Sequence, residues 1–128
     1  MTMNCGIRRK DDVTILDLSG RLSLGEALAF GPGSDVLLRD TIRELIKEGA
    51  RKVVLNLAGV TYVDSSGVGQ LTGAYTSVRN GGAELRLLNP TSQVKNLLKT
   101  TQLDTVFDIR YDEDSAIQSF GKGTAAQA

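Results

Sequence analysis

The residues best suited to chemistry in this chain form a short D-S-S-G cluster at positions 64–67. An apolar, strand-like run beginning at Val53 leads into the cluster, and Val68 and Leu71 open a helical pattern directly after it. A hydroxyl at the start of a helix lies beside unpaired backbone N–H groups and the positive end of the helix dipole. A phosphate on Ser65 would be stabilised there, so the position suits a phosphorylation switch.

The same cluster has a simpler interpretation, because Asp and Ser are common caps of helix N-termini. Spacing alone favours plain capping. Gly67 and Gly69 favour the switch, since glycine weakens a helix and leaves room for a partner to approach a neighbouring hydroxyl. Both interpretations remain open at the level of the residues.

Composition excludes several classes of function. The 128 residues suffice for one domain, and 15 basic residues cancel 15 acidic ones, so we expect no direct binding to DNA or RNA. The chain has no His, which removes Ser-His-Asp and Cys-His catalysis and zinc sites that use His. Its single cysteine, Cys5, is expected to be a strand residue. No secretory signal or membrane span is apparent, which predicts a cytoplasmic protein without a membrane partner.

Two other segments resemble ligand sites only superficially. Residues 31–35 (G-P-G-S-D) lack the Lys and the spacing of a phosphate-binding loop, so we interpret them as a plain loop. Asp112, Glu113 and Asp114 could suggest a metal cluster, but they are better placed to supply negative charge to the N-terminus of the last helix. We therefore expect neither a metal nor a cofactor.

The hydrophobic pattern predicts an α/β fold. Apolar strands alternate with amphipathic helices, which indicates a small mixed open sheet of four to five strands. An N-terminal antiparallel hairpin is followed by mostly parallel strands and about four helices. The expected strands are 3–10, 13–19, 52–57, 84–88 and 106–109; the expected helices are 34–48, 67–79, one from 89–92 onward and 112–120. We expect one domain over 1–120 and a frayed tail at 121–128.

Several segments together resemble a known family. They are L-S-G-R-L at 18–22, V-V-L-N-L-A-G-V-T-Y-V-D-S-S-G-V-G at 53–69, G-G-A-E-L-R-L-L-N-P at 81–90 and the helix with its following L-D-T-V-F over 94–107. The chain is similar to the STAS domain, and most closely resembles the free-standing bacterial anti-sigma factor antagonists.

The resemblance implies a regulatory mechanism. The unphosphorylated antagonist binds an anti-sigma factor that is also a serine kinase, which releases the sigma factor and so regulates transcription indirectly. The kinase phosphorylates the serine after the motif's Asp, and a PP2C-type phosphatase removes the phosphate. Here the acceptor is Ser65, with Ser66 as the fallback. The implied partner surface, which could extend to loop 89–92, comprises Gly20, Arg21, Leu22, Ser23, Asp64, Ser65, Ser66, Gly67, Val68 and Gly69.

The chain departs from the family at two places. Ser23 stands where antagonists often have an acidic residue, and segment 24–34 is longer than the usual connection to the first helix. Two other functions therefore stay open. One is a scaffold or stressosome-like subunit of the same fold. The other is a ligand-binding or enzymatic protein using Asp64 and Ser65, although no suitable Lys lies nearby in sequence to act as base, and we expect no enzyme.

Overall fold

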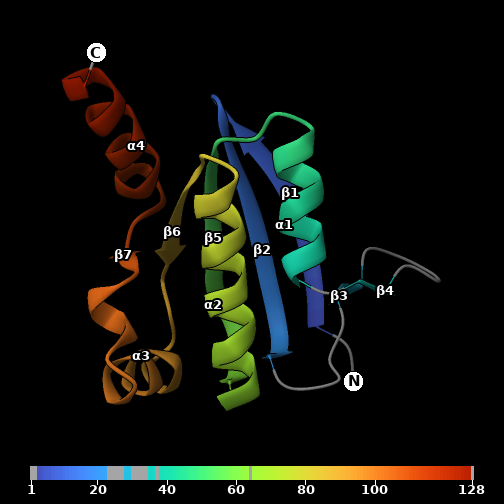
Figure 1. Ribbon diagram of the computed structural model, residues 1–128. Helices are drawn as coiled ribbons and strands as arrows, with labels where there is room; N and C mark the ends of the chain where they lie inside the picture. The colour runs from blue at the N-terminus through green and yellow to red at the C-terminus, as the bar shows by residue number, and fades with distance from the viewer. Residues whose placement is uncertain (1–2, 23–27, 30–34, 37, 64, 128) are drawn as a thin grey trace.

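The computed structural model describes residues 3–22, 28–29, 35–36, 38–63 and 65–127. Strands and helices alternate along the chain as the hydrophobic pattern predicts (Figure 1). The elements are β1 (Met3–Lys10), β2 (Val13–Leu22), β3 (Leu28–Ala29), β4 (Asp35–Val36), α1 (Leu38–Lys47), β5 (Lys52–Val63), α2 (Ser65–Asn80), β6 (Glu84–Leu88), α3 (Ser92–Thr100), the 3-10 helix η1 (Leu103–Thr105), β7 (Asp108–Arg110) and α4 (Glu113–Gln127).

The sheet is mixed, as predicted. Within the described ranges its strand order is β4-β3-β1-β2-β5-β6-β7. β1 and β2 form the expected antiparallel hairpin, while β2, β5, β6 and β7 run parallel. The four to five predicted strands correspond to β1, β2, β5, β6 and β7. β3 and β4 were not predicted, because strands of two residues are defined by their pairing with distant residues and leave no hydrophobic pattern of their own.

The larger of the two cores lies between the sheet and helices α1, α2 and α3. Alternate residues of the central strand β5, including Leu55 and Leu57, point to this side and are fully buried. Leu38 and Ile42 of α1 and Leu71 of α2 pack onto them. Figure 1 shows α1 and α2 side by side over the same face of the sheet.

A second, smaller core lies on the opposite face, beneath α4. Val54 of β5 points to this side, and Phe120 of α4 is completely buried against it and its neighbours. The guanidinium of Arg86 lies 4.4 Å from the centre of the Phe120 ring, and its Nε donates to Ser119 Oγ at 2.9 Å. The last helix therefore covers part of the second face of the sheet.

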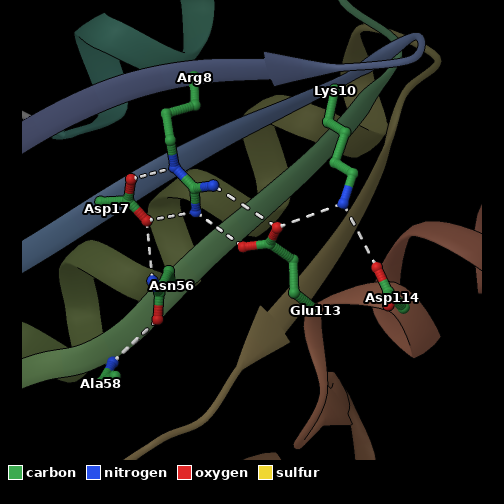
Figure 2. Close-up of polar contacts among 7 residues, drawn as sticks. All are labelled: Arg8, Lys10, Asp17, Asn56, Ala58, Glu113 and Asp114. Atoms are coloured by element: carbon green, nitrogen blue, oxygen red, sulfur yellow. Dashed lines mark hydrogen bonds and ion pairs between the residues drawn. The ribbon is translucent and has the colours of Figure 1, made fainter.

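A polar network joins the first residues of α4 to the β1–β2 hairpin (Figure 2). Arg8 donates from Nη2 to Asp17 at 2.9 Å and to Glu113 at 2.8 Å. Asn56 donates to the same Asp17 carboxylate at 2.8 Å. The hydrogen bond from Arg8 holds the pKa of Asp17 below its usual range. Lys10 adds an ion pair to α4, so two charged residues of the hairpin fix the helix from outside the second core.

Several predicted boundaries are corrected by tertiary pairing. Ala58-Gly59 was interpreted as a turn, yet β5 continues through both residues to Val63, because β2 pairs with β5 on both sides of Ala58, with shifts of register between. A helix was expected from Ser34 or Asp35, but Asp35 belongs to β4 and α1 begins at Leu38.

The C-terminal elements are shifted in the same way. The strand expected at 106–109 begins only at Asp108, since Phe107 is still in the connection and buries its ring against Tyr75. The backbone of residues 121–127, part of the segment expected to be a frayed tail, is helical, and α4 ends at Gln127. Cys5 is the buried strand residue that was expected, and burial raises the pKa of its thiol to about 12.

Across the described part of the chain, no helix combines the length and the apolar character that a membrane crossing requires. The same residues contain no cluster of carboxylates and Cys suited to a metal ion. Asp112 belongs to the run of three acidic residues that could suggest a metal site in the sequence. Its Oδ2 accepts a hydrogen bond from the backbone N–H of Ser115 at 2.9 Å, so Asp112 caps the last helix.

Candidate functional site

The carboxyl ends of β2 and β5 lie together and lead into the predicted site. The two strands are parallel, and their last registered pairs are Arg21 with Tyr62 and Leu22 with Val63. Helix α2 begins at Ser65, two positions beyond the end of β5. The predicted segments around Gly20 and Ser65 are therefore brought to the same end of the sheet. We call this end, formed by residues 20–22, 65–69 and 89–92, the switch rim.

A shift of register between β2 and β5 sets how the strands reach the rim. The pairing slips between Asp17 and Ser19, where Gly59 faces Ser19. A Cβ on Gly59 would lie 2.8 Å from Ser19 Cβ and 3.0 Å from the carbonyl oxygen of Leu18, so only glycine fits without movement. The irregularity is a β-bulge, which redirects the end of a strand.

Ser65 and Ser66 are the first two residues of α2. Backbone N–H groups at such positions have no partner within their own helix, so this is a place where a phosphate is stabilised. Asp64 and Ser23 lie outside the described residues, as do the side chains of Leu22, Ser65 and Ser66. The structure places the backbone of Ser65, the expected acceptor, in the first turn of α2, at the switch rim.

The next residues of α2 divide between core and surface. Gly67 is buried, and Val68, expected on the partner surface, packs its side chain into the larger core with 9% of its surface exposed. Gly69 is exposed, and a Cβ built on it would meet nothing within 4 Å. Nothing in the described structure requires a glycine at position 69, although glycine costs the helix stability.

The β2 side of the rim has a positively charged side chain, that of Arg21. Gly20 adopts a φ of 103°, which favours glycine, and its carbonyl accepts from Thr61 Oγ1 at 3.1 Å. Arg21 follows, exposed, with its guanidinium 4.8 Å from the centre of the Tyr62 ring. Tyr62 was expected to be core or partly buried and is half-buried. A positive charge therefore lies on the end of β2 beside the strand that leads to Ser65.

The loop at 89–92 joins the same end of the sheet. Asn89 has a left-handed φ of 50°, and Thr91 caps α3 by accepting from Val94 N at 3.4 Å. The Thr91 hydroxyl also donates to the carbonyl of Val60 in β5 at 3.4 Å. The loop is therefore attached to the strand that leads to Ser65. Sequence reasoning missed the Arg21–Tyr62 contact, which depends on the register of β2 and β5, and the Thr91–Val60 hydrogen bond, which depends on where the 89–92 loop lies in the fold.

Comparison with known proteins places these features in a family. The sequence model of the STAS domain family matches residues 5–116 of this chain. An anti-sigma-B factor antagonist of Bacillus subtilis is 24% identical over 118 residues, which cover 92% of this chain and 100% of the relative.

Two solved structures have a similar fold. An anti-sigma factor antagonist from Mycobacterium paratuberculosis superimposes with a TM-score of 0.72 at 17% identity, over 92% of this chain and 93% of the other. The Bacillus cell fate determinant SpoIIAA, in its phosphorylated form, superimposes with a TM-score of 0.63 at 20% identity, over 91% and 98% of the two chains. At these identities the likeness shows the fold.

Proposed function

This chain belongs to the STAS domain family, and from that premise we propose that it is an anti-sigma factor antagonist switched off by phosphorylation of Ser65. In the unphosphorylated state it binds a serine-kinase anti-sigma factor through the switch rim and releases the sigma factor. The kinase then phosphorylates Ser65 and a PP2C-type phosphatase reverses the modification. The protein acts in the cytoplasm as a binding module and performs no catalysis of its own.

The observation that carries the proposal is the position of Ser65 in the fold. It opens α2 at the rim where the ends of β2 and β5 meet and where the 89–92 loop is attached. A partner seated there would contact the first turn of α2, the Arg21 side chain and the loop together. Gly69 fits this role, because its missing side chain leaves open surface one turn beyond the acceptor.

The chemistry of the switch follows from the helix end. A phosphate adds about −1.5 to −2 charges, which the helix dipole and free N–H groups receive, so the domain stays folded. A partner surface shaped for a neutral hydroxyl would instead bury an unmatched dianion. Such a mismatch costs about 3 kcal/mol, roughly a hundredfold in affinity.

The relatives support this proposal in two ways. The Bacillus subtilis relative, matched over its full length, is an anti-sigma-B factor antagonist. SpoIIAA, which shares the fold, has been solved in a phosphorylated form, so a domain of this architecture accommodates a phosphate and remains folded.

Co-purification with the organism's serine-kinase anti-sigma factors tests the proposal. We expect Ser65→Ala to retain the kinase and Ser65→Asp to lose it. Ser115→Asp is the matched control: it adds the same charge to the first turn of α4, on the opposite face of the sheet, and should bind normally. Equal binding by both Ser65 variants would remove the switch from the proposal.

Phosphate mapping tests the acceptor itself. After incubation with the kinase and ATP, mass spectrometry should locate the phosphate on Ser65 and find none on the Ser65→Ala variant. Label on Ser66 alone would transfer the role to the fallback residue. Label outside residues 64–66 would show that the site is wrong.

A further inference from the structure

Among the described residues, the outer edge of β1 is unpaired along most of its length. In the described residues, β3 pairs only with Met3 and Asn4, which leaves residues 5–10 of β1 paired on one side only, with β2. Figure 1 shows β1 as the outermost of the long strands, next to α1. An edge with unpaired N–H and C=O groups is a template for a further strand.

The register of the hairpin identifies which backbone groups are free. Lys10 and Val13 close a two-residue turn and are therefore a hydrogen-bonded pair. Counting back from Lys10 along the alternating ladder, Arg8 and Gly6 also bond to β2. Arg9 and Ile7 turn their N–H and C=O groups outward.

A groove of about 700 Å³ runs beside this edge, between β1 and α1. Ile7 projects into it with 42% of its surface exposed, among the largest apolar exposures of the described residues. The opposite wall carries Asp40 and Glu44, four residues apart on one face of α1, and Glu48, the first residue after the helix. The groove is therefore suited to an extended strand that presents basic side chains toward α1.

The basic residues of β1 have acidic partners within the chain, which reduces their repulsion of such a strand. Arg8 and Lys10 point to the opposite face, where Asp17, Glu113 and Asp114 neutralise them. Arg9 alone among these three lines the groove, and its contact with Glu48 is long, 3.7 Å, between largely exposed side chains. The charges that commonly protect a sheet edge are thus already paired within the chain.

We propose that the occupant of this groove is β1 of a second copy of the chain, added antiparallel about a two-fold axis at Arg8. A strand that complements the acidic residues of α1 needs a basic side chain on the groove side. The same residue must turn its backbone N–H and C=O toward the edge of β1. Arg9 meets both requirements. In this register Ile7 pairs with Arg9 of the second copy, and Gly6 leaves space opposite its Lys10. The two Arg8 residues face each other across the axis, each already paired with Asp17 and Glu113 of its own chain. The β3 contact at Met3 and Asn4 stays intact.

The register also gives Arg9 of the second copy an acidic partner. The Arg9–Glu48 contact aligns β1 with α1. Two residues of strand span about 6.6 Å and four residues of helix about 6 Å, so Ile7 lies level with Glu44. Arg9 of the second copy, opposite Ile7, therefore lies beside Glu44. Glu44 has only a loose, exposed pair with Lys47 at 3.8 Å, so it is available for this contact.

Sedimentation equilibrium at increasing concentration tests the dimer. We expect the mass to rise from 13.7 kDa toward twice that value. Arg9→Glu should remain monomeric, and Arg9→Glu with Glu44→Arg should dimerise again. Lys99→Glu, the same charge reversal at an exposed residue of α3, should dimerise like the unmodified chain. A mass of one chain at every concentration, or a dimer that survives Arg9→Glu, would overturn the proposal.

Amide exchange by NMR tests the pairing residue by residue. Exchange at Ile7 and Arg9 should slow as concentration rises, while Arg8, already bonded to β2, should not change. Unchanged exchange at Ile7 and Arg9 in a dimeric sample would exclude this edge. Ser65→Ala should dimerise normally, because β1 lies two strands from β5 and the switch rim is at the other end of β2 from the hairpin turn. Failure of either proposal therefore leaves the other testable.

Discussion

Gly69→Ala separates the stability of the domain from its binding to a partner. Gly69 lies inside α2, exposed, with open space where a Cβ would go. Replacing it with Ala removes backbone freedom from the unfolded chain and restores helix propensity, which stabilises a helix by about 1 kcal/mol. With a urea m-value of about 2 kcal/mol per molar, the unfolding midpoint should rise by about 0.5 M.

The same methyl group should weaken the complex. If a partner packs against the first turns of α2, an extra methyl at position 69 costs about 1–3 kcal/mol of interface packing, roughly fivefold to a hundredfold or more in affinity. Urea unfolding followed by circular dichroism and a binding titration with the kinase measure the two effects. Thr76→Ala, on the same face two turns along, is the control that should be stabilised without losing affinity. A stabilised Gly69→Ala variant that binds normally would refute the placement of the interface.

Two further predictions concern the scaffold. Gly59→Ala should destabilise the domain by about 2 kcal/mol in urea unfolding, because its methyl would meet Ser19 and backbone at 3.0 Å or less, whereas Gly6→Ala, whose Cβ would have a single neighbour at 4.0 Å, should cost less. An equal cost for the two glycines would contradict the close approach. Arg8 lowers the folded pKa of Asp17, so this carboxylate stabilises the fold above its unfolded pKa of about 4 and loses that contribution as pH falls. In the Asp17→Asn variant, the free energy of unfolding should therefore fall less steeply as the pH drops below about 4. An unchanged pH dependence would show that Asp17 does not contribute to acid unfolding.

The elements set by local pattern could be predicted from the sequence. The β1–β2 hairpin, the strand at 84–88 and helix α2 follow from alternation and helical spacing within short windows. The strand-to-helix junction at 64–67 also belongs to this class, since an apolar run ending in Asp, Ser and Gly is a local signal. This signal placed Ser65 at the start of α2 before any tertiary contact was known.

Features created by distant residues could not be predicted. Ala58-Gly59 has the composition of a turn, and only the approach of Ser19 shows that Gly59 serves a continuous strand. The Arg21–Tyr62 contact likewise depends on the register between two strands forty residues apart. Val68 was included in the partner surface because of the resemblance to the family, whereas its helical spacing with Leu71 is that of a core residue, and its side chain packs into the core.

The way α4 closes the sheet has a consequence for how the protein is made. Arg8 and Lys10 leave the ribosome about a hundred residues before Glu113, Asp114 and Phe120, which complete the far side. Until then Val13, Ile15 and their neighbours have no cover from the helix, and a nascent chain in that state is prone to associate with others. The emergence of α4 is therefore the step that protects this face of the sheet.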